Sequence, residues 1–319
     1  MTQPPKKKHV LIRTPARLGQ NELLRDFLEG YDYLSWANRA ACLDLIISQP
    51  EFCAKIEATA KSLLGQNGPP VAIERIINSA KLEMHFAAYH STESLLGLLF
   101  AFTIDPSYPW VWLTKYRFEE YNALVSKLAK VGLAMFNPRP DAETFAKFLF
   151  FNSTEPRYKT EIDRSAKFAI TYFKMLANEF QDRADYNSYK HGLRTLAPHE
   201  FKAKLESETK QALLNWDELT TTYLVLMNPV KWKSELVSDL HVVYKAIDHE
   251  RSKRIIIMNT HLMYNLFQIQ KALVGGTKQA AIWLSSKEGE AFDVLRPTKT
   301  GNILNKMTIS PEPLNQKPK

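Results

Sequence analysis

The sequence has few cysteines and no long apolar run, and each absence narrows the class of protein. Cys42 and Cys53 are the only cysteines, too few for a disulfide framework or a zinc cluster. No window reaches the roughly 18 uncharged apolar residues of a membrane span. The Pro- and Lys-rich start from Met1 to Arg13 lacks the apolar core of a signal peptide. We therefore expect a cytoplasmic protein that does not enter a membrane.

The chain also lacks the sequence features of a nucleotide-hydrolysing protein. Gly275-Gly276-Thr277 has neither the preceding strand nor the Lys-Ser/Thr pair of a phosphate-binding loop. No internal repeat and no low-complexity tract is present. We therefore expect a globular protein that works without a cofactor.

The charge is unbalanced in favour of cations. The 42 Lys and Arg residues exceed the 34 Asp and Glu residues, which gives a net charge of +8 and favours an anionic partner such as RNA. Part of the excess lies in the two ends of the chain, at Lys6, Lys7, Lys8, Arg13, Lys306, Lys317 and Lys319. Such ends are either solvated and disordered or part of a binding surface, and the sequence leaves both interpretations open.

Helical periodicity dominates the pattern of apolar residues. Spacings of four and three recur in three rows, which are Ile162, Ala166, Ala169, Phe173, Leu176 and Phe180; Leu236, Leu240, Val243 and Ile247; and Ile255, Leu262, Leu266, Ile269 and Leu273, the last interrupted by Asn259. Further helices are expected near 20–47, 51–64, 71–103, 111–135, 141–150, 199–214 and 217–227. The predicted fold class is all-α, a multi-helix bundle with a small C-terminal β-hairpin.

Glycine and proline divide the predicted elements into four parts. A basic tail and a helical pair occupy 1–67, a helical core 71–227, and a helical hairpin with a β-hairpin 230–296; the tail at 297–319 is predicted to be disordered. The breaks are Gly68-Pro69-Pro70 and Asn228-Pro229. The β-hairpin is expected from Ala280 to Leu284 and from Glu290 to Leu295.

The segment from Asp185 to Arg194 carries the most informative group of polar residues. If it is helical, residues three and four apart share a face, which gives a polar stripe of Asn187, Lys190, His191 and Arg194. A second, apolar stripe contains Tyr186, Tyr189, Leu193 and Leu196. The polar stripe is either a phosphate- or RNA-handling site or an ordinary solvated helix face.

Glu93 is a second candidate because it interrupts an apolar row. Leu82, Phe86, Tyr89, Leu96 and Phe100 surround it at helical spacing. A carboxylate buried there needs a partner, and a His, Lys or Asn of the segment from Asp185 to Arg194, His191 among them, would suit it. A rotated helix would instead place Glu93 in water. If Glu93 and His191 meet, the carboxylate should raise the pKa of the imidazole.

Metal chemistry is the rival enzymatic hypothesis. His241, Asp248, His249 and His261 fall on two adjacent predicted helices, and helix pairs can build metal sites. No Glu-x-x-His spacing occurs there, so solvated or core-edge histidines are the better interpretation and no metal is expected.

A resemblance to a known family rests on two short motifs. The order of His90-Ser91-Thr92-Glu93-Ser94-Leu95-Leu96, an amphipathic helix, and Asn187-Ser188-Tyr189-Lys190-His191-Gly192 resembles the HEPN superfamily over residues 71–200. HEPN domains are small helical domains of toxins, antiviral defence and RNA-processing systems. Many are metal-independent endoribonucleases with an Arg followed, after a few residues, by a His.

The resemblance implies a function and a set of roles. His191 would move protons, Lys190 or Arg194 would stabilise the charge on the phosphate, and Asn187 would orient the phosphate or the imidazole. The resemblance also implies a homodimer that completes the site across a two-fold axis.

The chain departs from the family motif at one position. Tyr186 stands where the family places its Arg, and Arg183 lies outside the family spacing. Some family members lack the catalytic pair and act as scaffolds. The alternative function is therefore a non-catalytic helical module whose Tyr/Lys/His stripe binds a protein partner.

Overall fold

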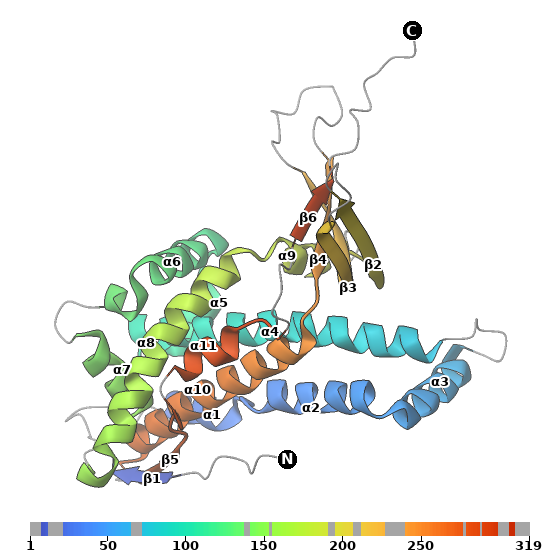
Figure 1. Ribbon diagram of the computed structural model, residues 1–319. Helices are drawn as coiled ribbons and strands as arrows, with labels where there is room; N and C mark the ends of the chain where they lie inside the picture. The colour runs from blue at the N-terminus through green and yellow to red at the C-terminus, as the bar shows by residue number, and fades with distance from the viewer. Residues whose placement is uncertain are drawn as a thin grey trace. The chain divides into compact units, whose positions relative to one another are not determined.

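The computed structural model describes most of the chain, as residues 8–11, 22–64, 72–136, 141–152, 155–190, 195–206, 212–226, 240–276, 279–287, 289–298 and 306–309. Eleven α-helices lie in this part of the chain (Figure 1): α1 (Glu22–Gly30), α2 (Ser35–Ser48), α3 (Pro50–Leu64), α4 (Ile73–Ile104), α5 (Pro109–Lys115), α6 (Phe118–Val131), α7 (Ala142–Phe150), α8 (Lys159–Gln181), α9 (Ala184–Lys190), α10 (His249–Gly275) and α11 (Glu290–Leu295). The predicted multi-helix bundle with a minor β component is confirmed.

The described chain forms two compact units, and both are discontinuous in sequence. Unit 1 comprises 1–40, 87–182 and 253–296, and unit 2 comprises 41–86, 183–252 and 297–319. Helices α2, α4 and α10 each begin in one unit and end in the other. The four consecutive parts predicted from glycine and proline are a different division, and they stay a prediction.

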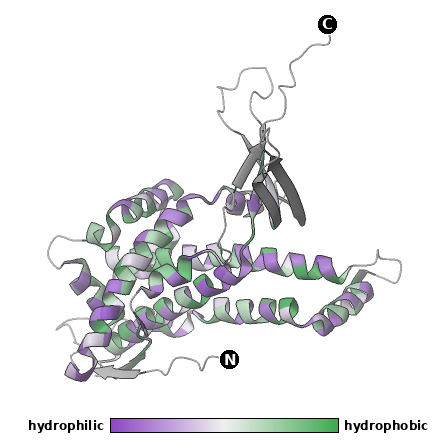
Figure 2. Ribbon diagram, in the orientation of Figure 1, coloured by the Kyte–Doolittle hydropathy of each residue, from purple (hydrophilic) through white to green (hydrophobic). Residues whose placement is uncertain are grey.

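Helix α8 is the centre of unit 1, and α6, α7 and α11 pack against it. All six residues of the predicted row from Ile162 to Phe180 are buried. Figure 2 shows hydrophobic and hydrophilic residues interleaved along α6, α7 and α8, as expected for helices that bury one face. The row of apolar residues was therefore sufficient to predict both this helix and its buried side.

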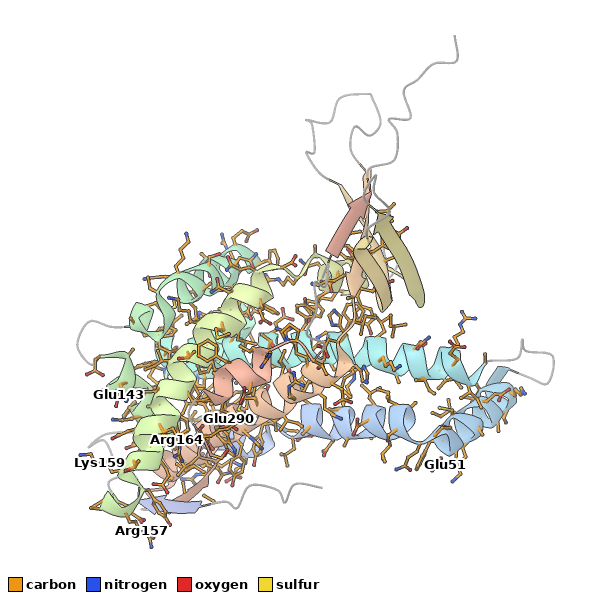
Figure 3. The ribbon with its side chains drawn as sticks, viewed as in Figure 1. Glu51, Glu143, Arg157, Lys159, Arg164 and Glu290 are labelled. Carbon is orange, nitrogen blue, oxygen red and sulfur yellow. The ribbon has the colours of Figure 1, made fainter. Side chains whose placement is uncertain are left out.

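Hydrogen bonds through the loop that precedes α11 connect this helix to α8 in unit 1. Both Nε and Nη2 of Arg164 donate to the carbonyl oxygen of Ser285, at 3.0 and 2.8 Å. The backbone N–H of Ser285 donates to Ser165 Oγ, and its hydroxyl donates to Glu290 Oε2 at 2.6 Å. Figure 3 labels Arg164 on α8 and Glu290 on α11. The loop before α11 is thereby held on both sides.

The predicted C-terminal hairpin is wrong in its pairing. Strand β5 (Gln279–Ile282) exists, but its antiparallel partner is β1 (Lys8–Leu11), with Lys8 opposite Ile282. The second predicted strand, 290–295, is helix α11. Residues 8–11 are thus a strand in a segment that the sequence predicted to be a tail.

Unit 2 contains a four-stranded antiparallel sheet that the sequence did not predict. Its order is β2-β3-β4-β6, from β2 (Thr195–Glu206), β3 (Ala212–Leu226), β4 (Leu240–Ala246) and β6 (Lys306–Ile309). The helices expected at 199–214, 217–227 and 236–247 are therefore wrong. The tail predicted to be disordered supplies β6.

A run of β-branched and aromatic residues explains the central strand. Thr220, Thr221, Thr222 and Tyr223 are all buried, on both faces of β3, and such residues pack well on a pleated surface. Leu, Ala, Lys and Glu, which favour helices, dominate β2, and pairing with β3 overrides that preference.

Within the described residues, no helix is both long and apolar enough to cross a membrane.

Candidate functional site

Helix α9 is the predicted motif helix, and it belongs to unit 2. It covers Ala184–Lys190, so Tyr186, Asn187 and Lys190 lie on it as expected. His191 and Arg194 fall outside the described residues, and their places in the polar stripe stay predictions.

The three described motif residues differ in exposure. Tyr186 is fully buried, Asn187 is half-buried, and Lys190 is exposed. The ammonium of Lys190 lies 4.5 Å from the ring centroid of Tyr186, a cation–π contact. Helix α9 therefore buries its aromatic side and presents its C-terminal cation to solvent.

Asp185 is the residue that the motif analysis missed. Its side chain is fully buried, and both carboxylate oxygens are engaged. Oδ2 lies 2.9 Å from Nε2 of His85 on α4, and Oδ1 lies 3.1 Å from Nζ of Lys245 on β4. The partners of Asp185 are about 60 and 100 positions away in sequence, so no local sequence pattern relates the three residues. The sequence alone shows only that an acidic residue occupies position 185.

The two bases keep Asp185 ionised. Burial on its own raises the pKa of this carboxyl, but the charge of Lys245 and the hydrogen bond from His85 outweigh burial and lower the pKa to about 2. His85 and Lys245 are themselves nearly buried, with side-chain exposures of 11% and 13%. A buried, hydrogen-bonded group of opposite charges is costly to break and fixes α9 to both neighbouring elements.

A second contact fixes the other side of α9. The Tyr189 hydroxyl donates to Glu83 Oε1 at 2.6 Å, and the Tyr189 ring stacks on Phe86 with centroids 4.0 Å apart. Glu83, His85 and Phe86 lie within one turn of α4. The tyrosine that the sequence placed on the apolar stripe therefore does pack, and it also anchors through its hydroxyl.

Glu93 lies on the part of α4 that belongs to unit 1, and its side chain is half-buried. Its backbone carbonyl accepts a hydrogen bond from Tyr121 Oη at 3.2 Å. The predicted pairing of Glu93 with His191 is not tested, because His191 lies outside the described residues.

A buried amide explains the interruption in the α10 row. Asn259 is fully buried; its amide nitrogen donates to Ser91 Oγ and Thr92 Oγ1, each at 3.0 Å, and its oxygen accepts from Tyr172 Oη at 2.8 Å. The interruption is therefore a polar link between α4, α8 and α10 inside the core of unit 1.

The residues of the metal hypothesis do not form a metal site in the part of the chain that the structure describes. No group of three or more His, Cys, Asp or Glu residues there could hold an ion. His241 lies on β4 rather than on a helix. Asp248 precedes α10 and accepts the backbone N–H of Arg251 at 2.9 Å, which is the role of a helix N-cap.

His261 is half-buried like Asp248 and His249, and it differs from them in one buried ring nitrogen. Its ring stacks on Trp283 with centroids 5.1 Å apart, and Nδ1 is buried without a hydrogen-bond partner. Burial lowers the pKa of this imidazole to about 4, so it is neutral at physiological pH.

No protein-family model, no characterised protein and no solved structure matches the chain. The HEPN resemblance therefore stays a prediction.

Proposed function

We propose that the chain is an RNA-associated helical protein that contacts RNA phosphates through the C-terminal end of α9. The proposal rests on the exposure of Lys190. The acidic residue of the same helix, Asp185, is buried, and the cation Lys245 balances its charge. Asp185 is engaged by His85 and Lys245 inside unit 2, and Lys190 is in solvent.

Several properties of this end of α9 support an anionic partner. Lys190 is followed in sequence by two more basic residues, His191 and Arg194. The excess of 42 basic over 34 acidic residues supports association with a polyanion. Because α9 is anchored through Asp185 and Tyr189, Lys190 is held on a fixed helix.

The finer form of the proposal is a metal-independent endoribonuclease. The 2′-hydroxyl would attack the adjacent phosphate, His191 would transfer protons, and Lys190 or Arg194 would stabilise the charge that develops on the phosphate oxygens. Asn187, half-buried on α9, would orient the phosphate or the imidazole. This form rests on the motif and on the near-neutral unperturbed pKa of histidine.

RNA binding is tested with fluorescently labelled single-stranded RNA and anisotropy over a range of salt concentrations. Lys190→Gln should weaken binding by about threefold to tenfold and reduce the slope of log affinity against log salt by about 1, because one phosphate contact is lost. Lys127→Gln is the matched control, because Lys127 is an exposed lysine of α6. Equal losses in the two variants would show that only net charge matters and would sink the α9 proposal.

The ribonuclease form is tested on the same RNA in the presence of a metal chelator. Cleavage by the wild type should be lost in His191→Ala and on RNA with a 2′-deoxy nucleotide at the cut site, while binding persists. Binding without any cleavage would leave an RNA-binding protein and discard the nuclease.

A protein-interaction module is the second candidate. Tyr186 is buried under Lys190, and the half-buried Tyr189 is engaged by Glu83 and Phe86, so both rings already have partners within unit 2. Large exposed apolar residues occur instead on α2, α3 and the start of α4, at Leu45, Leu63 and Ile73.

A further inference from the structure

Helix α10 reaches the surface of unit 1 along one line of residues. Between residues 255 and 274 its side chains are buried except at five positions with spacings of four and three, which are Ile257, His261, Tyr264, Gln268 and Lys271. Ile257 is exposed, and the other four side chains are half-buried. We call these five residues the α10 stripe. The one accessible side of this helix therefore carries a tyrosine, an imidazole, an amide and a cation beside one isoleucine.

A second tyrosine joins the stripe from a distant part of the chain. Tyr33, in the turn between α1 and α2, is half-buried, and its ring meets Tyr264 edge to face with centroids 5.6 Å apart. Nε2 of Gln268 donates to the Tyr33 hydroxyl at 3.4 Å, across 235 positions of sequence. The ammonium of Lys271 lies 5.9 Å from the Tyr33 ring centroid, a cation–π contact. Two tyrosine rings, an amide and a cation are thus brought together at the surface of unit 1.

The chain that carries the α10 stripe has positive charges and no negative ones. Residues 251–287 contain six Lys and Arg residues and no Asp or Glu. Two acids come next to the stripe in sequence, and each is oriented by its own chain. Oδ1 of Asp32 accepts the backbone N–H of Leu34 at 3.0 Å, and Glu290 accepts the hydroxyl of Ser285 at 2.6 Å. The charge of this segment therefore favours an anionic partner.

We propose that the α10 stripe binds single-stranded RNA, with Tyr264 and Tyr33 against bases and Lys271 against a phosphate. The inference rests on the proposed association with RNA, but it adds a surface in unit 1 that does not involve Lys190 of unit 2. Aromatic rings interleaved with cations are the arrangement by which proteins hold an unpaired strand, because each nucleotide offers a base face and a phosphate. An acidic protein segment would match the charge but gives no reason for the two rings.

The length and the ring content of the stripe set the form of the ligand. From Ile257 to Lys271 the helix extends about 21 Å, which suits a short site of about four nucleotides. In a duplex the bases stack on one another and their faces are covered, so an unpaired strand is the form that fits.

Fluorescence anisotropy of the full chain with a labelled oligouridine tests the proposal. Tyr264→Leu should weaken binding by about fivefold or more, because a base loses its stacking partner, whereas Tyr264→Phe keeps the ring and should bind within about twofold of the wild type. Lys271→Gln should weaken binding by about threefold and reduce the slope of log affinity against log salt by about 0.7, the loss of one phosphate contact on a single strand. Lys127→Gln, an exposed lysine of α6, is the matched control and should leave binding unchanged.

An abasic strand of the same length separates stacking from charge. The wild type should bind it more weakly than oligouridine, and Tyr264→Leu should bind it as the wild type does, since no base is present to lose. Equal affinity of the wild type for the two strands would overturn the proposal without relying on the folding of any variant. So would equal losses in Tyr264→Leu and Tyr264→Phe, or displacement of oligouridine by poly-glutamate of equal charge as readily as by unlabelled oligouridine.

The α10 stripe and the α9 surface can fail separately. Weaker binding in Lys190→Gln with wild-type binding in Tyr264→Leu and Lys271→Gln would reject the stripe and keep the α9 proposal. The opposite result would keep the stripe and reject α9. A chain that does not bind oligouridine at low salt would overturn the stripe outright.

Discussion

The protonation state of a buried ionisable residue depends on its hydrogen-bond and ion-pair partners as well as on burial. Asp185 is fully buried and remains ionised because Lys245 and His85 contact both of its oxygens. His261 lacks a partner for Nδ1, and burial keeps it neutral. Burial therefore suppresses the charge of His261 in unit 1, whereas in unit 2 the partners of Asp185 preserve its charge against the same effect.

The neutral His261 should make the protein less stable in mild acid. The pKa is about 4 in the folded protein, below the ordinary value of 6.5, so the unfolded chain binds the proton more readily. Stability is fully present above pH 6.5 and falls as the pH drops from 6.5 to 4, by up to about 3 kcal/mol. His261→Phe keeps a ring against Trp283 and removes the titration.

Urea unfolding of the wild type and His261→Phe at several pH values gives the measurement. The variant should lose less stability than the wild type between pH 6.5 and 4. Parallel curves for the two proteins across this interval would contradict the assignment to His261.

At the scale of elements, the secondary-structure predictions were correct where a helix buries one face against a single core. The row from Ile162 to Phe180 predicted α8 because each of its residues faces the same core. The row from Leu236 to Ile247 has the same spacing, yet β4 covers Leu240–Ala246 and pairs with β3 and β6. Spacing alone does not distinguish the two, since the strand is selected by partners distant in sequence.

The candidate site was predictable to a similar extent. Lys190 was found because it belongs to a local polar stripe, and the structure places it in solvent. Asp185 was missed because His85 and Lys245, which give it its role, come from α4 and β4. Sequence spacing therefore predicts which side chains share one face of a helix. The contacts that fix that helix to distant elements are visible only in the folded structure.

The side chain of Asp248 caps the N-terminus of α10. Asp248 accepts the backbone N–H of Arg251 at 2.9 Å and, through the same side chain, the N–H and hydroxyl of Thr298, each at 2.7 Å. Asp248→Ala should lower the free energy of unfolding by about 1–2 kcal/mol, because the cap and the two bonds to Thr298 are lost together. Thermal unfolding measures the change.

Asp248→Asn serves as the comparison, because its amide oxygen can still accept at the helix end. It should lose less stability than Asp248→Ala. Equal melting temperatures for the wild type and Asp248→Ala would show that the cap does not contribute.

For the whole molecule, the acid response should occur in two separate pH intervals. The first, from pH 6.5 to 4, belongs to His261. The second includes Asp185, whose pKa falls from 3.8 to about 2 on folding; its contribution is present above pH 4 and is lost as the pH approaches 2, at about 2 kcal/mol. Asp248 contributes in the same interval, because burial raises its pKa but the hydrogen bonds from Thr298 and Arg251 lower it by more.

Asp185→Asn separates the two intervals. At pH 7 it should destabilise the protein by about 3 kcal/mol or more, because Lys245 then loses its buried counter-ion, and the deficit should shrink below pH 4. The decline between pH 6.5 and 4 should remain, whereas His261→Phe should show the reverse pattern. Asp26→Asn, on the exposed surface of α1, controls for loss of charge. Urea unfolding from pH 7 to pH 2 would refute the assignment if Asp185→Asn matched the wild type throughout.

The discontinuous units have a consequence for synthesis and for evolution. The chain passes between the units five times, and three of the passages lie inside α2, α4 and α10. Unit 1 cannot be complete until residue 296 has left the ribosome, although its first residues are made at the start. Neither unit can be copied, exchanged or moved to another protein as one continuous stretch of gene. Both must therefore have been inherited together, and a chain that ends before residue 296 would lack part of each unit.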